Sequence, residues 1–200
     1  MKRVCITILL ILIGFFQLYA PNLNKETEQR KNEEKQRIIK LNEVLDRYSE
    51  YHNLINFTPY DKQSSLKAIH RIFLIESIAK VETALSLVEY NKLTPKERVL
   101  KAYNSKEEAV GLLQIRPIMY THLNKELKLC NFKLADRWDG EKSIQMFIVF
   151  QDYYNPKWQI EKASRDWNGG GDRGMVKNAT INYHKLVHRE YCKLMKQIES

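Results

Sequence analysis

Residues 64–89 read SSLKAIHRIFLIESIAKVETALSLVE, and on a helix their apolar side chains fall on nearly every side. A helix that is apolar all round is normally central and buried. We therefore expect residues 64–89 to form one helix at the centre of the fold. Two glutamates within it, Glu76 and Glu82, have different surroundings, and this difference bears on the function of the protein.

The neighbours of the two glutamates on this helix predict different roles for them. Lys80 lies four residues after Glu76, which is the favourable order for a glutamate–lysine pair, so Glu76 is predicted to be structural. The neighbours of Glu82 along the helix are apolar or small, with no cation within reach. A carboxylate in such surroundings is costly to ionise, so its pKa should rise, as a general acid working near neutral pH requires. Glu82 is the candidate for chemistry unless a cation on another helix or the solvent satisfies it.

The rest of the chain also favours helices. Residues 22–37 are dense in charge, which predicts a spacer or a solvated helix. After them, apolar residues at helical spacing predict an amphipathic helix that begins at Ile38 and ends before Phe57. Thr94 and Pro95 indicate a helix start, with Thr94 as the cap and Glu97 at the third position. Further helices are expected near 117–128, 141–154, 158–167 and 180–198, with breaks at 111–117 and 168–174. No stretch alternates with period two, so the fold class is mainly α with at most a short hairpin.

The N-terminal segment MKRVCITILLILIGFFQLYA, residues 1–20, has two cations followed by an apolar run and a small residue. This layout is typical of a signal peptide, and an uncleaved N-terminal anchor is the alternative. We therefore expect an exported protein, periplasmic or secreted, whose contact with a membrane is limited to such an anchor. The expected organisation is this segment, a charged spacer with an amphipathic helix over 21–65, and one domain over 66–200.

The chain is basic, with a formal net charge of +9. In an exported protein this suits an anionic polymer such as cell wall or a membrane surface, although a solvated charged face is the simpler interpretation. Beyond Cys5, the cysteines are Cys130 and Cys192. They could pair in an oxidising compartment, but two cysteines define no spacing framework.

Three short blocks in the correct order resemble the soluble lytic transglycosylase family, within residues 66–190. Ile78-Ala79-Lys80-Val81-Glu82-Thr83 is similar to the family's helix that ends in valine-glutamate-serine, with Thr83 in the serine position. Gly111-Leu112-Leu113-Gln114-Ile115-Arg116-Pro117 resembles its glycine-leucine-x-glutamine-isoleucine-x-proline block. Ala163-Ser164-Arg165-Asp166-Trp167-Asn168-Gly169-Gly170 resembles its alanine-x-x-tyrosine-asparagine-x-glycine block. The residues between the first two blocks are more numerous than is usual, which indicates an insertion within 84–104.

The resemblance implies a lysozyme-like domain from an exported bacterial branch of these enzymes. It implies cleavage of the bond between N-acetylmuramic acid and N-acetylglucosamine in peptidoglycan, with Glu82 as the single acid and base and a 1,6-anhydro ring as the product. The substrate-binding residues that it implies are Thr83, Gly111, Gln114, Trp167 and Asn168. Trp167 is equally well explained as a core aromatic, and Arg116 is either a contact for a peptide carboxylate or a surface cation. No cofactor, metal or nucleic acid is expected.

Three alternatives remain open from the sequence. One is a hydrolase of the same bond, with Asp136, Asp139 or Asp166 as a second carboxylate. Another is an inactive cell-wall-binding or assembly protein, which the Thr83 substitution and the insertion favour. The third is a membrane-tethered adaptor in which residues 22–65 act.

Two other patterns carry little weight. Residues 169–174 read GGGDRG and match a nucleotide-binding pattern, but they follow an expected helix rather than a strand. His184, His188 and Cys192 form a stripe on the last helix, where a packed stripe is a better explanation than a zinc site. Thr180 is expected to cap that helix.

Overall fold

The structure is a computed structural model and describes residues 25–46, 62–128 and 130–199. The predicted signal segment and the predicted end of the amphipathic helix before Phe57 lie outside these residues. The chain divides into two units, Met1–Glu43 and Val44–Ser200. Residues 25–46 are helical, and residues 25–40 are exposed, in agreement with the solvated helix predicted for the charged stretch.

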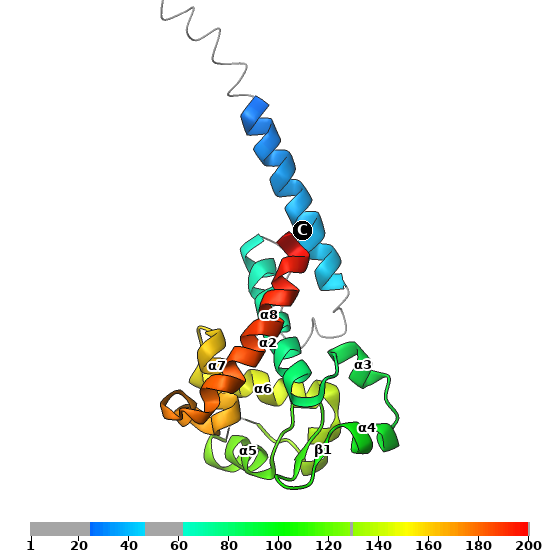
Figure 1. Cartoon of the computed structure of the whole chain (residues 1–200), viewed down its shortest axis with the longest axis vertical. Helices are drawn as coiled ribbons and strands as arrows, with labels where there is room; N and C mark the ends of the chain where they lie inside the picture. The colour runs from blue at the N-terminus through cyan, green and yellow to red at the C-terminus, as the bar shows by residue number, and fades with distance from the viewer. Residues whose placement is uncertain (1–24, 47–61, 129, 200) are drawn as a thin grey trace, which may run out of the picture. The chain divides into compact units, whose positions relative to one another are not determined.

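The second unit consists mainly of helices, as predicted (Figure 1). Its elements are α2 (Lys62–Thr83), α3 (Leu87–Asn91), α4 (Pro95–Lys101), β1 (Tyr103–Asn104), β2 (Ala109–Val110), α5 (Pro117–Thr121), the π-helix η2 (His122–Glu126), the 3-10 helix η3 (Leu134–Trp138), α6 (Gly140–Tyr154), α7 (Ile160–Gly169), the 3-10 helix η4 (Gly171–Val176) and α8 (Ala179–Glu199). The antiparallel strands β1 and β2 form the short hairpin that the sequence allowed, with Tyr103 opposite Val110. No helix within the described ranges is both long and apolar enough to cross a membrane.

Helix α2 is the central element of this unit. Its residues 72–79 are all buried, as predicted for a helix that is apolar all round. Helix α8 runs alongside α2 and also packs against α7 (Figure 1). The end of α7 is joined to the loop after β2 by a hydrogen bond from the Trp167 indole N–H to the Leu113 carbonyl, and the end of α2 is joined to α8 by one from the Tyr183 hydroxyl to Glu82. These segments carry the site described below.

The expectation that one helix extends to residue 89 is wrong, because α2 ends at Thr83. Ala84 adopts a left-handed backbone with φ of 60°, which stops the helix. A new helix, α3, then begins after Ser86, whose hydroxyl accepts the Glu89 N–H while the Glu89 carboxylate accepts the Ser86 N–H. This Ser-x-x-Glu capping box is a sequence signal for the break that the apolar pattern concealed.

The other predicted helix boundaries were mostly correct. Thr94 caps α4 in a capping box with Glu97, and Pro95 occupies the first turn, as predicted. Thr180 is not the cap of the last helix, because α8 already includes Ala179. Its buried hydroxyl instead donates to the Gly174 carbonyl and accepts a hydrogen bond from Arg165. Cys130 and Cys192 are both free thiols.

Candidate active site

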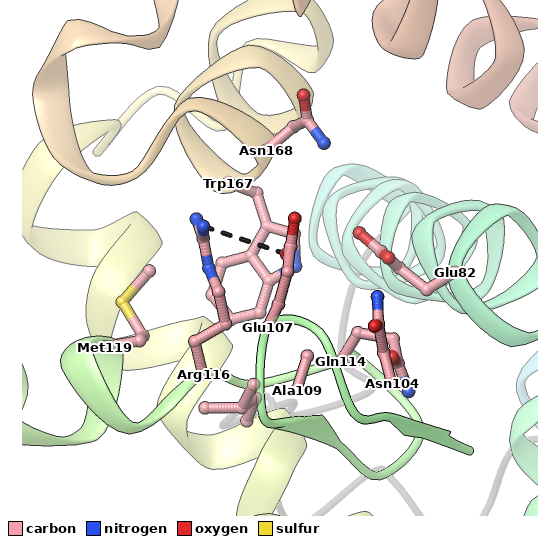
Figure 2. A pocket seen from close by; sticks show the side chains of 10 residues that line it. Glu82, Asn104, Glu107, Ala109, Gln114, Arg116, Met119, Trp167 and Asn168 are labelled. Carbon is pink, nitrogen blue, oxygen red and sulfur yellow. Dashed lines mark ion pairs between the residues drawn. The ribbon is translucent and has the colours of Figure 1, made fainter.

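Glu82 lies in the last turn of α2 and lines a small cavity of about 60 Å³ (Figure 2). The cavity also receives side chains from the hairpin, the loop before α5 and the end of α7. The residues that line it are Glu82, Asn104, Glu107, Ala109, Gln114, Ile115, Arg116, Met119, Trp167 and Asn168. Three of the predicted site residues besides Glu82, namely Gln114, Trp167 and Asn168, thus lie around the same cavity, although they come from segments far apart in the sequence.

The phenol of Tyr183 holds the Glu82 carboxyl in place. Its hydroxyl donates to Glu82 Oε1 at 2.6 Å from α8. The pKa of Tyr183 is raised well above its usual value, first by burial and then by the adjacent Glu82 charge, so the phenol stays protonated as a donor. This contact orients one carboxyl oxygen of Glu82 and leaves Oε2 for another partner.

The pKa of Glu82 is raised to about 7, mainly by burial. The hydrogen bond from Tyr183 opposes this rise, the charge of Glu107 adds to it, and the charge of Arg116 opposes it. A carboxyl group that titrates near neutral pH can both give and take a proton under physiological conditions. The prediction of a raised pKa is confirmed, but the polar partner from α8 was not foreseen.

Glu76 is structural in this fold, although its partner is not the predicted one. Lys80 pairs with Glu89 of α3 at 2.9 Å, whereas the buried Glu76 carboxylate accepts the Leu87 N–H at 3.0 Å. Burial, opposed by this hydrogen bond, raises the pKa of Glu76 to about 7 as well. The pKa values therefore do not separate the two glutamates. Their positions do, because Glu82 lines the cavity while Glu76 joins α2 to the start of α3.

The pKa of Glu76 predicts a pH-dependent stability. A carboxyl group whose pKa is higher in the folded than in the unfolded chain stabilises the fold fully below its unfolded value of 4.5, and this contribution is lost as pH rises through about 7. Glu76→Gln keeps an acceptor for Leu87 and cannot ionise, so relative to wild type it should gain roughly 2–3 kcal/mol of stability between pH 5 and pH 8.5. Urea unfolding of both proteins at the two pH values measures this gain, and parallel pH profiles would contradict it.

The loop between β2 and α5 presents Gln114 at the cavity. Two backbone hydrogen bonds between Val110 and Ile115 close this loop, within which Gly111 and Gln114 have φ of 77° and 50°. The Gln114 amide nitrogen donates to the carbonyls of Ala102 and Gly111, at 3.0 and 3.1 Å. Both amide hydrogens are thereby used, so the side-chain oxygen is the group left to meet a ligand.

Trp167 and Asn168 occupy the last turn of α7, so Asn168 lies inside the helix rather than just beyond its end. Trp167 is only 5% exposed, donates its indole N–H to the Leu113 carbonyl at 3.2 Å and packs edge-on against Phe147. It is therefore a core aromatic that also forms part of the cavity wall. Asn168 is exposed, and its amide is available at the rim.

Thr83 and Gly111 do not line the cavity, and the binding roles predicted for them stay predictions. The Thr83 hydroxyl donates to the Ala79 carbonyl at 3.0 Å and thus belongs to the end of α2. Gly111 is buried, and a Cβ built on it would lie 2.0 Å from the Arg137 carbonyl oxygen. Its contribution to the site is to let the Gln114 loop pass this carbonyl.

The carboxylates predicted as partners for a hydrolase have other contacts. Asp139 caps α6, Asp136 accepts the Lys133 N–H, and the buried Asp166 pairs with Lys162. None of the three lines the cavity. Glu107, in the turn between β1 and β2, lines it instead and lies 3.8 Å from Arg116 (Figure 2).

Sequence reasoning missed Glu107 and Tyr183. Glu107 stands four residues before Gly111, so its position in the hairpin that leads into the glutamine block was a usable signal. Tyr183 lies 101 residues from Glu82, and no local pattern points to it. In the described part of the chain, no group of three or more histidine, cysteine, aspartate or glutamate side chains could hold a metal ion.

Three comparisons, with protein-family models, with curated proteins and with solved structures, found no match to this chain.

Proposed function

We propose that the protein is an exported peptidoglycan lytic transglycosylase with a lysozyme-like domain, and that Glu82 is its single acid and base. The observation that carries the proposal is the position of Glu82, a carboxyl group with a pKa of about 7 that lines a cavity beside three side-chain amides. The resemblance of the three sequence blocks supports the same assignment. Export rests on the sequence of residues 1–20 alone.

In this proposal Glu82 transfers two protons in succession. The protonated carboxyl gives its proton to the oxygen that bridges N-acetylmuramic acid C1 and N-acetylglucosamine C4, as the C1–O bond breaks. The resulting carboxylate then takes the proton of the muramic C6 hydroxyl, whose oxygen attacks C1 and forms the 1,6-anhydro ring. Glu82 ends the cycle protonated, so neither a water molecule nor a cofactor is consumed. A pKa near 7 suits both steps.

The polar side chains of the cavity suit an N-acetylated sugar. Asn104, Gln114 and Asn168 line the cavity with amide groups, and those of Asn104 and Asn168 can both donate to and accept from an acetamido group. Gln114 can only accept, through its side-chain oxygen, because its amide nitrogen already donates to two backbone carbonyls. These groups supply orientation without adding a charge next to Glu82.

A hydrolytic muramidase is the second candidate, and Glu107 is the observation that favours it. A hydrolase of this bond uses a second carboxylate either as a base for water or as a nucleophile. Glu107 lines the same cavity as Glu82, and its charge contributes to the raised pKa of Glu82. Its carboxylate lies 3.8 Å from the Arg116 guanidinium, which positions it at the cavity.

Mass spectrometry of the fragments released from purified sacculi tests the proposal. Muropeptides that end in 1,6-anhydro-muramic acid are expected. Products with reducing ends alone would contradict the transglycosylase mechanism and favour Glu107 as a second carboxylate. A wild-type protein that binds sacculi and releases no fragments would contradict both enzymatic assignments.

The contact between Tyr183 and Glu82 predicts a shift in the pH dependence of the reaction. The phenol stabilises the ionised form of Glu82, so Tyr183→Phe should raise the pKa of Glu82 further. Because the first step needs the protonated carboxyl, kcat/KM should fall as the pH rises through the pKa of Glu82. The midpoint of this decrease should lie about one pH unit higher in the variant than in wild type. A pH–rate profile of both proteins on solubilised glycan strands measures the shift. Tyr191→Phe, a change on the same helix at a residue that does not line the cavity, is the control and should leave the profile unmoved.

A further inference from the structure

Helix α4 lies on the surface of the second unit, and none of its residues is buried. Its inward contact is made by Arg98, whose guanidinium lies 4.9 Å from the Tyr90 ring centroid and donates to the Trp138 carbonyl at 3.4 Å. The buried Ala102 follows as the C-cap, and its carbonyl accepts the Gly111 N–H at 2.9 Å. Polar contacts therefore hold α4 in place, and its apolar side chains take no part in the core.

The other side of α4 presents large apolar side chains to solvent. Val99 is 49% exposed and Leu100 is 76% exposed, and Tyr103, which begins β1 directly after the helix, is exposed as well. Residues four apart share a side of a helix, so Arg98 and Ala102 form the inward side while Val99 and Leu100 lie away from it. A group of exposed apolar side chains of this kind marks a surface that binds a partner or a membrane.

Exposed lysines accompany this apolar group. Residues 92–106 contain one carboxylate, that of Glu97, which accepts the Thr94 N–H at 2.8 Å in the capping box. The same stretch contains five cations, so its net charge is +4, out of +9 for the whole chain. Glu107, which follows, lines the Glu82 cavity and lies 3.8 Å from Arg116. Four of the five cations are exposed lysines, namely Lys92, Lys96, Lys101 and Lys106.

The combination of charge and apolar surface selects the kind of partner. A soluble polyanion would need the lysines alone and would leave the valine, leucine and tyrosine side chains in water. At an anionic bilayer the lysines meet the lipid phosphates, while apolar side chains enter the boundary beneath the headgroups and a tyrosine sits at headgroup level. The surface formed by α4 and the start of β1 has all three kinds of side chain.

We propose that α4 and the start of β1 dock the protein on the surface of an anionic phospholipid bilayer. This surface lies almost entirely within residues 84–104, where the sequence indicates an insertion relative to lytic transglycosylases. The inference goes beyond the proposed function and does not depend on it. The Ala102 carbonyl also accepts the Gln114 amide at 3.0 Å, so docking places the loop that carries Gln114, and with it the Glu82 cavity, beside the bilayer.

Quenching of tryptophan fluorescence by lipids with brominated chains tests docking at this surface. Of the chain's three tryptophans, Trp158 and Trp167 are buried, whereas Trp138 is half-buried with its ring centroid 6.1 Å from that of Tyr103. Bromine quenches only at short range, so the signal reports on Trp138 even if residues 1–20 also bind lipid. Vesicles of equal parts phosphatidylcholine and phosphatidylglycerol should quench the full chain, and half-quenching by phosphatidylcholine alone should need at least about tenfold more lipid. Equal quenching by both vesicles would overturn the proposal.

A pair of matched variants assigns the quenching to α4. Leu100→Glu should raise the lipid concentration at half-quenching at least about tenfold, because it replaces an exposed apolar side chain by a charge that anionic headgroups repel. Val176→Glu makes the same charge change at an apolar residue that is 81% exposed, in η4 between α7 and α8, on the other side of the unit from α4 (Figure 1). This control should stay within about twofold of wild type. Equal loss in the two variants would overturn the proposal, since overall charge would then decide.

The same variants distinguish the bilayer from a second copy of the chain. A wild-type protein that anionic vesicles do not quench, but that dimerises in analytical ultracentrifugation while Leu100→Glu stays monomeric, would assign the surface to a second copy and overturn docking on lipid. None of these measurements involves cleavage, so a protein that cleaves no glycan would refute the proposed function and leave the docking result standing.

Discussion

Glu82→Gln is expected to lower the rate of fragment release from sacculi by at least about a hundredfold, and up to about ten-thousandfold. Glutamine has the same shape as glutamate and can still accept the Tyr183 hydroxyl through its side-chain oxygen, so the end of α2 should keep its structure. It can neither give the first proton nor take the second. Both steps of the proposed mechanism are lost together, while binding to the glycan strand should persist. Release of soluble fragments and sedimentation with sacculi measure the two properties separately.

Glu76→Gln is the matched control for this experiment. It makes the same substitution on the same helix, six residues earlier, at a buried carboxyl whose pKa is also about 7. The Glu76 carboxyl accepts the Leu87 N–H and does not line the cavity, so cleavage should stay within about threefold of wild type at pH 6. If Glu76→Gln abolished cleavage and Glu82→Gln did not, the assignment of the catalytic residue would be wrong.

Gly111→Ala should be among the most destabilising single changes in the domain. The new methyl group would lie 2.0 Å from the Arg137 carbonyl oxygen, and the backbone would be held at a φ of 77° that alanine disfavours. Neither the loop around Gly111 nor the backbone of Arg137 can move away easily, because the Arg137 guanidinium donates to the carbonyls of Glu108 and Ile115 at 3.0 and 2.9 Å. A loss of at least about 3 kcal/mol is expected from strain and overpacking combined.

Gly171→Ala distinguishes the cost of backbone strain from the cost of the contact with Arg137. Gly171 has nearly the same backbone angle, 80°, but nothing within 4 Å of the added Cβ. Its replacement should therefore cost only the backbone strain of about 1–2 kcal/mol. The excess loss in Gly111→Ala, at least about 1–2 kcal/mol or several degrees in Tm, reports the contact with Arg137. Thermal unfolding of the two variants measures it, and equal destabilisation would show that the loop after β2 moves away from Arg137 at little cost.

The sequence predicted those parts of the fold that depend on local interactions. The Thr94–Glu97 capping box and the apolar surroundings of Ile72–Ala79 involve residues within one or two helical turns of each other, so their consequences can be worked out on a single helix. The prediction that the central helix continues to residue 89 was wrong because it, too, rested on a local pattern alone. An apolar pattern cannot distinguish one long helix from two helices separated at Ala84. The signal for the second helix is its N-cap, Ser86.

The choice between the two glutamates shows what only the tertiary structure could decide. The sequence indicated that Glu82 has no cation on its own helix and that Glu76 is structural. It assigned Lys80 to Glu76, however, whereas the break at Ala84 brings Glu89 to Lys80 and the Leu87 N–H to Glu76. A helix pairing rule holds only where no competing partner comes close in space.

By itself, the sequence determined the mainly α architecture and the absence of a cation near Glu82 on its own helix, because helix periodicity, capping and apolar spacing act over a few residues. The tertiary structure decided which groups surround that carboxyl. Tyr183 comes from a helix 101 residues away, and the Glu107 side chain reaches the cavity from the turn of the hairpin. Such contacts depend on how α2, α8 and the hairpin pack together, and the burial that this packing produces is the main cause of the raised pKa of Glu82.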